Sequence, residues 1–236
     1  MARGVTLGEM VTSVRIEANM DPDPALSVNM EPLIKELIRR EYERLYEEFD
    51  WPFLRIRSDI DLQAGQRYYD VPDDLNLERI ERIDYFWGDK WFPLDRGISM
   101  DDYNFHDSDA DVRAEPAMKW DVLYTGSEAQ LEIWPIPATN DQKIRIIGIR
   151  NFTPLITTDA ICDLDDRMII LFAASEILAR KQSPEAATKQ TKAVERFRTV
   201  KGRSVQTRKS SFSFSGGNGA ERRRDREPLV AYVRNP

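Results

Sequence analysis

The sequence is poor in the side chains that most metal and nucleophile sites require. It contains one cysteine, Cys162, and one histidine, His106. A single cysteine cannot form an intramolecular disulfide or a cysteine-based zinc site, and a single histidine excludes two-histidine motifs such as H-E-x-x-H. No apolar run approaches the ~20 residues of a membrane-spanning helix. These absences argue against most metalloenzyme and hydrolase classes, and we expect no metal, no cofactor and no membrane contact.

The charge is distributed unevenly along the chain. The 236 residues carry 34 basic and 41 acidic side chains, a net charge of −7. Residues 203–236 hold eight basic and three acidic residues, a net +5, so the remaining body carries −12. An acidic body repels phosphates and disfavours a general nucleic-acid surface. A basic tail on such a body can instead reach an acidic face of a partner or of another copy.

Residues 1–52 predict two helices. Thr6 and Glu9 form a capping-box pattern, and apolar residues then recur at helical spacing. A second amphipathic helix follows with Pro32 in its first turn, where proline is tolerated, and it ends before Trp51-Pro52.

Residues 53–152 change to a period of two, which is typical of half-buried strands. Gly65 predicts a tight hairpin before a short returning strand, and Gly88-Asp89 predicts another. A third turn is predicted at Thr125-Gly126-Ser127, and an Ile-rich strand follows over residues 143–150. Six or so short antiparallel strands favour a small β-sandwich or barrel-like module.

Residues 153–202 return to helix, and residues 203–236 form a separate tail. A buried helix is predicted over residues 164–181, and another begins at Ser183-Pro184 and ends at Gly202. The Ser-, Gly- and Arg-rich tail is expected to be disordered alone and to order on a partner. The predicted fold class is α+β: a helical bundle from the N- and C-terminal segments, an inserted antiparallel β-rich module and an extended C-terminal tail.

Several residues could carry chemistry, but each has a simpler interpretation. The acidic loop 107–111 resembles a calcium loop but has Val112 and Met118 where that motif needs glycine and glutamate. We interpret His106 as a surface residue, Cys162 as a small packing residue, and the adjacent Asp165 and Asp166 as a coincidental pair. The tryptophans could stack on bases or sugars, although packing is the favoured role.

The order of two motifs carries a family resemblance. Residues 63–74 read Gln-Ala-Gly-Gln-Arg-Tyr-Tyr-Asp-Val-Pro-Asp-Asp, and residues 131–137 read Leu-Glu-Ile-Trp-Pro-Ile-Pro. With the helical start, Phe49-Asp50-Trp51-Pro52 and the final helical pair, this resembles the head-to-tail adaptor proteins of tailed bacteriophages, the connector group that includes tail tubular protein A-like chains. The resemblance spans residues 49 to about 180 and leaves the first helix and the tail outside.

The resemblance implies a structural virion protein that is not an enzyme. It implies a ring, commonly of twelve copies, between the portal protein and the tail or nozzle proteins, with DNA only passing through the channel. The expected location is the head–tail interface of the virion, and the host cytoplasm during assembly. Two alternatives stay open from the residues alone: a particle-associated cell-wall glycosidase, and a sugar- or calcium-binding module.

The tail holds the residues that we predict to bind a partner. Apolar residues recur there at spacing two, which fits an added strand or a groove-bound segment, and arginines between them can meet acidic side chains. The predicted partner is the portal or a neighbouring subunit. The predicted partner-binding residues are Phe212, Phe214, Arg222, Arg223, Arg224, Arg226, Leu229, Val230, Tyr232 and Val233.

Overall fold

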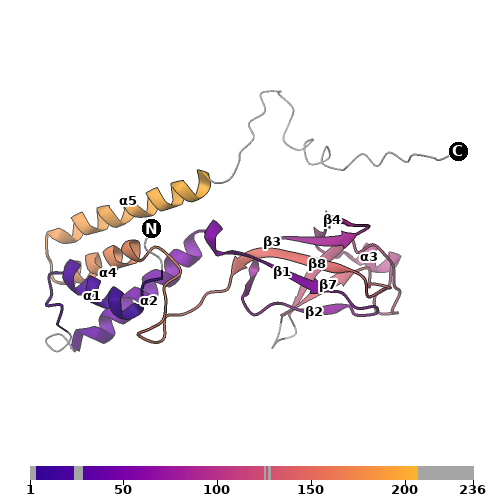
Figure 1. Ribbon diagram of the computed structural model, residues 1–236, viewed down its shortest axis with the longest axis horizontal. Coiled ribbons are helices and arrows are strands. Elements are labelled where there is room, and N and C mark those ends of the chain that lie inside the picture. Colours follow the sequence, from indigo (N-terminus) through magenta and orange to yellow (C-terminus); the bar gives the residue numbers. More distant parts are fainter. Residues whose placement is uncertain (1–3, 24–28, 125, 127–128, 207–236) are drawn as a thin grey trace, which may run out of the picture.

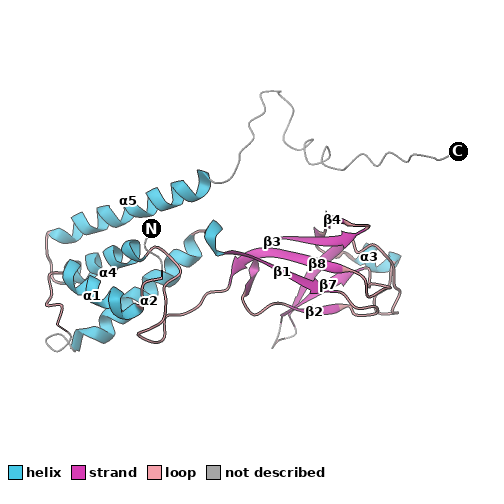
Figure 2. Ribbon diagram, in the orientation of Figure 1, coloured by secondary structure: helices cyan, strands magenta, loops and turns pink. Residues whose placement is uncertain are grey.

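The protein is α+β, with a helical bundle at one end and a β module at the other (Figures 1 and 2). The computed structural model describes residues 4–23, 29–124, 126 and 129–206. The strands lie between the second and third long helices in the sequence, and the β module is therefore an insertion in the bundle. The four long helices are α1 (Leu7–Glu17), α2 (Glu31–Glu48), α4 (Asp166–Arg180) and α5 (Glu185–Gln206).

Helix α4 is the centre of the bundle, because α1, α2 and α5 all pack against it. Its sequence is apolar on nearly every side, and Met168, Ile169 and Ala173 are fully buried. The first helix begins as predicted: the Thr6 hydroxyl accepts from the Glu9 N–H, and the Glu9 carboxylate accepts from the Thr6 N–H. This capping box satisfies two N–H groups that the first turn would otherwise leave without partners.

Helix α5 extends past the residue predicted to end it. Gly202 lies within the helix, which continues to Gln206, so the prediction of a C-cap at Gly202 is wrong. The preceding turn is anchored to the bundle, because Val200 is fully buried and Lys201 lies over the rings of Phe49 and Phe197. Tertiary packing thus outweighs the cost of one glycine in a helix, which is about 1 kcal/mol.

Two four-stranded sheets pack around a second core, separate from that of the bundle. The core between them includes Ile83, Tyr85, Leu131 and Ile144. The first sheet has the order β1 (Arg55–Asp61), β8 (Lys143–Arg150), β3 (Leu75–Trp87), β4 (Lys90–Pro93). The second has the order β2 (Tyr68–Asp70), β7 (Ala129–Trp134), β6 (Lys119–Tyr124), β5 (Asp95–Arg96), and the short helix α3 (Met100–Phe105) lies between β5 and β6 in sequence.

The chain around Gly65 does not form the predicted hairpin. Strand β1 pairs with β8, whereas β2 pairs with β7 in the other sheet, so the loop at Gly65 carries the chain between sheets. Gly65 still needs its glycine, because its φ is +81° and a Cβ there would lie 2.7 Å from the Arg113 guanidinium. The hairpin at Gly88-Asp89 is confirmed, with positive φ at both residues and β3 paired to β4.

The bundle and the β module are joined through the end of α2. Trp51 is fully buried there, and its indole N–H donates to the Leu45 carbonyl at 2.9 Å. From β3, the Arg79 guanidinium donates to the Tyr46 and Glu47 carbonyls at 2.8 and 2.7 Å. These contacts anchor β3 and the segment just before β1 to the last turn of α2. Among the described residues, none of the helices has the length and apolarity needed to span a bilayer.

Candidate functional site

The ten residues predicted to bind a partner all lie within 207–236, outside the described residues. The structure does place the point from which this tail departs. Helix α5 ends at Gln206, and one turn earlier the Lys201 ammonium lies 5.1 Å from the centre of the Phe49 ring, at the end of α2. The tail therefore starts beside the junction of the bundle and the β module.

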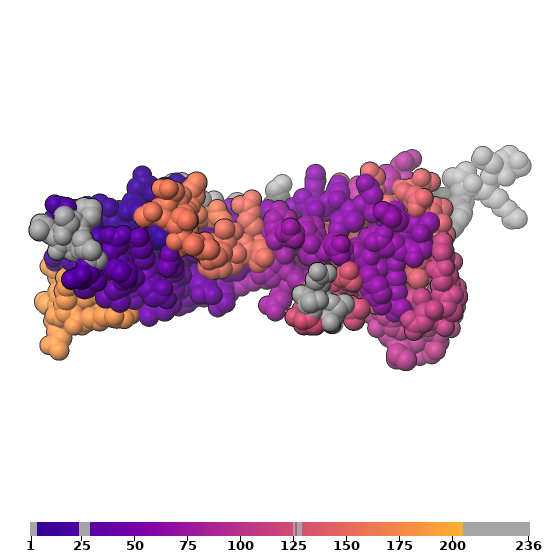
Figure 3. Space-filling model, turned by 90° about the horizontal axis from the view of Figure 1, so that it is seen from below, coloured from indigo at the N-terminus to yellow at the C-terminus, as the bar shows by residue number. Residues whose placement is uncertain are grey.

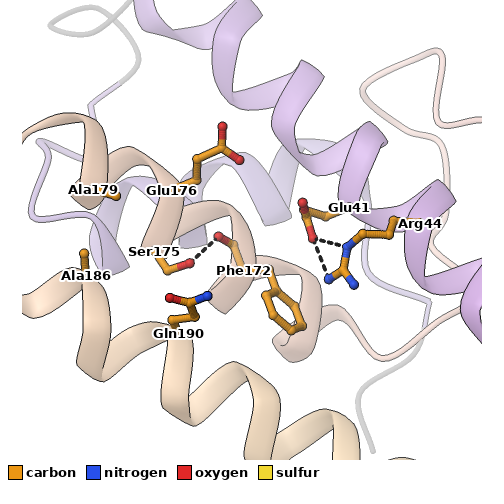
Figure 4. A pocket seen from close by; sticks show the side chains of 8 residues that line it. All are labelled: Glu41, Arg44, Phe172, Ser175, Glu176, Ala179, Ala186 and Gln190. Atoms are coloured by element: carbon orange, nitrogen blue, oxygen red, sulfur yellow. Dashed lines mark hydrogen bonds and ion pairs between the residues drawn. The ribbon is translucent and has the colours of Figure 1, made fainter.

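A groove of about 430 Å³ runs over α4 between α2 and α5 (Figure 4). Three of its polar side chains, those of Glu41, Arg44 and Ser175, are engaged with one another or with the backbone. Arg44 donates to the Glu41 carboxylate at 2.9 and 2.8 Å and lies over the Phe172 ring, while the Ser175 hydroxyl donates to the Phe172 carbonyl at 2.7 Å. Because that hydroxyl proton is held by a carbonyl of its own helix, Ser175 is not arranged as a nucleophile.

Glu176 on the same groove is also held by ion pairs. Burial opposes its charge, but hydrogen bonds from Arg180 and Arg40 outweigh this effect and lower the pKa of the Glu176 carboxyl. A general acid needs a raised pKa to keep its proton near neutral pH. Glu176 is therefore arranged as a structural carboxylate rather than as an acid catalyst.

The carboxylates of the acidic loop contact protein groups rather than one another. The Asp107 carboxylate accepts from the N–H groups of Asp109 and Ala110 at 2.9 and 3.3 Å. Asp109 pairs with Arg67, and Asp111 pairs with Arg113 through two hydrogen bonds of 3.0 and 2.6 Å. This arrangement favours the interpretation of a solvated loop. Across the described part of the chain, no three His, Cys, Asp or Glu side chains form a group that could hold a metal.

His106 packs between two aromatic rings. Its ring centre lies 5.6 Å from those of both Phe105 and Trp134, and its carbonyl accepts from the Trp134 indole N–H at 3.0 Å. His106 is half-buried and ends helix α3. Its described contacts give it a packing role.

Cys162 and Asp165 also have structural environments. Burial raises the pKa of the Cys162 thiol to about 12, far from the range of a reactive thiolate. The Asp165 carboxylate accepts from the Met168 N–H at the start of α4 and binds Arg196 of α5. Its neighbour Asp166 has a raised pKa, mainly because of burial. Since Asp165 is committed to a cap and an ion pair, the two acids do not form a glycosidase pair across a cleft.

A partly buried polar cluster in the β module, with Glu132 at its buried centre, was not predicted from the sequence. Arg67 donates to Glu132 at 2.7 Å, and the Tyr103 hydroxyl donates to the same carboxylate oxygen at 2.9 Å. Lys119 binds both oxygens of Asp102 in α3 at 2.8 and 2.7 Å. These contacts fasten α3 and the acidic loop to the second sheet. Local sequence patterns carry little indication of this cluster, because its partners lie 65, 29 and 17 residues apart in the chain.

A comparison with protein families matches residues 5–219 to the SU10 adaptor protein family. The chain belongs to the SU10 adaptor family. Membership agrees with the resemblance to phage head-to-tail adaptors. The match is wider than the motifs around Gly65 and Trp134, because it includes the first helix and the first part of the tail, with Phe212 and Phe214. A search of curated proteins finds no match.

Proposed function

We propose that this SU10 adaptor family member is a non-enzymatic structural protein that forms a ring between the portal and the tail of a bacteriophage. The observation that carries the proposal is the family match over residues 5–219, which covers both hydrophobic cores. The described side chains that could do chemistry support a structural role, since Ser175, Cys162 and Asp165 are each held by packing, caps or ion pairs.

The shape of the molecule suits an adaptor. Figures 1 and 3 show an elongated body with helices at one end and strands at the other. Two chemically different ends can contact two different partners, here the portal on one side and tail or nozzle proteins on the other. A ring also needs two different lateral faces that meet head to tail and close by rotation. The resemblance to phage connectors suggests twelve copies.

The acidic body fits a channel through which DNA passes. Residues 1–202 carry a net charge of −12. Phosphates gain no attraction from acidic walls, which is the opposite of the basic surfaces of DNA-binding proteins. An acidic lining would let the genome slide without stable binding. The protein would then reside at the head–tail interface of the virion, after assembly in the host cytoplasm.

The C-terminal tail would serve as an anchoring arm. Its apolar pairs and its arginines would bind the portal or a neighbouring subunit, with Phe212, Tyr232 and Arg223 among the contacts. Burial of one large apolar side chain contributes about 1.5–3 kcal/mol, whereas ordering the backbone costs about 1–2 kcal/mol per residue. One arm is therefore weak. In a ring, the arms are held close to their binding sites, and this high effective concentration makes the whole assembly stable although each single contact is weak.

The test is electron microscopy and co-sedimentation of the chain with its portal ring. We expect a monomer or weak oligomer alone and a closed ring on the portal. A chain ending at Gln206 should keep its melting temperature at low concentration, because it retains every described residue of both cores, but should lose most of its portal association. Full-length protein that never joins the portal would refute the adaptor function, and a truncated chain that joins equally well would refute the arm.

A further inference from the structure

Strand β1 is a long sheet edge without a described partner on its outer side. It pairs with β8 over all seven residues, Arg55 to Asp61, in a continuous register. The Leu62 N–H donates to the Gln142 carbonyl at 2.8 Å. Because every second residue of an antiparallel strand directs its N–H and C=O groups toward the partner, residues 56, 58 and 60 face β8 in the same way as Leu62. The N–H and C=O groups of residues 55, 57, 59 and 61 therefore point away from β8, toward the open side.

Proteins usually block strand addition with proline, with bulges, with charged side chains on the edge strand or with charged side chains that point inward. β1 has the third of these features only on its outer face, at Arg55, Arg57, Asp59 and Asp61. β1 contains no proline and no register shift, and its inward positions are Ile56, Ser58 and Ile60. Ile56 and Ile60 pack against the core of the β module but stay half-buried. The inner face of β1 is therefore an incompletely covered apolar strip.

The opening continues onto the other sheet. β2 is the edge strand of its own sheet, and a groove of about 440 Å³ lies between the end of β1 and β2. Half-buried Val71 lines it, together with three carboxylates, those of Asp61, Asp70 and Asp73, and no basic side chain. We call the free edge Arg55–Asp61 with this adjoining groove the β1 edge groove.

The chain itself carries a segment that matches this surface. Residues 211–215 read Ser-Phe-Ser-Phe-Ser, which alternates with the period of a strand. Phe212 and Phe214 would point inward onto the strip of Ile56 and Ile60, and the serines would point to solvent. Arg208 and Lys209 precede the segment, separated from it only by Ser210, and are complementary in charge to the acidic groove.

We propose that the β1 edge groove binds residues 211–215 of a neighbouring copy, which adds to β1 as a fifth strand of the first sheet. This inference rests on the proposed ring and names one partner of its arm. β-Strand addition obtains affinity from the backbone bonds and specificity from alternate side chains. Each copy would give its arm to one neighbour and receive the arm of the other, which is a contact that a closed ring permits.

A neighbouring copy is the source of the arm that the proposed ring supplies. In Figure 1, α5 lies above the rest of the bundle, whereas β2 lies at the lower edge of the β module. The described part of α5 ends near the junction of the bundle and the β module, where the Lys201 ammonium lies 5.1 Å from the centre of the Phe49 ring. The residues from Gln206 to Ser211 reach at most about 17 Å when fully extended. In a closed ring, an arm of this length can meet the exposed sheet edge of the adjacent copy, and the cross-linking experiment below distinguishes that copy from the same chain.

The first experiment measures binding of a fluorescent peptide of residues 207–219 to the full-length protein by polarisation. Arg57→Pro removes one outward N–H and is compatible with a sheet edge, because that N–H has no ladder partner. We expect it to weaken binding at least tenfold. Arg57→Ala keeps the N–H and is the matched control, expected to change binding less than twofold. A peptide with Phe212→Ser and Phe214→Ser should lose binding, which tests the groove even if Arg57→Pro fails to fold.

A second experiment identifies the source of the arm. Protein with Arg57→Cys is mixed with protein with Ser213→Cys under oxidising conditions, since both positions would lie on the solvent face. We expect a disulfide-linked dimer of the two different chains, while Cys162 is buried and gives little background. A chain with both substitutions that cross-links within itself, as a monomer, would overturn the neighbouring copy as the source.

Other outcomes would overturn the site altogether. The groove assignment fails if the peptide does not bind, if it binds Arg57→Pro and Arg57→Ala equally, or if it binds the portal protein and not this chain. None of these measurements requires ring formation on the portal. A chain that assembles on the portal but does not bind the peptide would support the proposed function and refute this inference. A chain that binds the peptide but never joins the portal would support the groove and refute the proposed function.

Discussion

Arg196 in α5 binds both oxygens of Asp165, the residue that caps α4, with distances of 3.1 Å from Nε to Oδ1 and 2.7 Å from Nη2 to Oδ2. The Asp165 side chain is 1% exposed and also accepts the Met168 N–H. One carboxylate therefore begins the central helix of the bundle and attaches the last helix to it. The parallel geometry of two bonds is typical of strong arginine–carboxylate pairs.

We predict that Asp165→Ala lowers the free energy of unfolding by about 2–4 kcal/mol. The loss combines an N-cap, worth about 1 kcal/mol, with charge-assisted hydrogen bonds worth about 1.5–3 kcal/mol, discounted because Arg196 is partly exposed. Urea unfolding followed by circular dichroism measures it. Asp163→Ala is the control, because Asp163 has a 3.9 Å contact with an exposed Arg150 and should change stability by less than about 0.5 kcal/mol. Equal effects of the two substitutions would contradict the role of Asp165.

Two acidic partners of Arg67 should differ strongly in their contribution. Glu132 is 7% exposed and accepts from both Arg67 and Tyr103, whereas the Asp109 side chain is 84% exposed. We expect Glu132→Ala to cost about 2–4 kcal/mol, because it leaves a largely buried guanidinium without its inner partner. Asp109→Asn, the matched control on the same arginine, should cost less than about 1 kcal/mol. Similar losses in thermal unfolding would show that burial does not decide the strength of this pair.

The carboxyl of Asp102 should titrate at unusually low pH. Hydrogen bonds from Lys119, and then from Ser99, lower its pKa from 3.8 to about 2. Because the folded state favours the ionised form, the stabilisation is present above the ordinary pKa and is lost as the pH falls from about 4 toward 2. The carboxyl carbon shift, followed by NMR, reports the midpoint directly. Lys119→Met should raise the midpoint by about one unit, while Lys90→Met on β4 should leave it unchanged.

Cys162 should be inert in the folded protein. It is fully buried, and burial raises the pKa of its thiol to about 12, so the reactive thiolate is nearly absent at pH 8. We expect a thiol reagent to modify it at the rate of unfolding in buffer and within seconds in urea. Ile161→Cys adds a thiol at a position that is 58% exposed and should react rapidly in the native state. Rapid native modification of Cys162 would contradict the packing of this segment.

Local patterns were sufficient to predict most elements. The Thr6–Glu9 capping box, the proline in the first turn of α2 and the hairpin at Gly88-Asp89 all depend on residues a few positions apart. The period of two in residues 143–150 predicted β8 with its observed bounds. The position of Gly202 misled the prediction, because a glycine near a helix end is a common stop signal and the packing of the preceding turn was not visible.

The division into helices, strands and tail, and the two motifs that resemble phage adaptors, follow from the amino-acid sequence, because propensity, capping and periodicity act over a few residues. Only the tertiary structure decided that β1 pairs with β8 rather than β2, that Arg67 meets Glu132, and that one edge of the first sheet has no described partner. The physical reason is that alternation tells which face of a strand is buried but not which distant strand lies beside it. Partners 65 or more residues apart are chosen by the packing of the whole module.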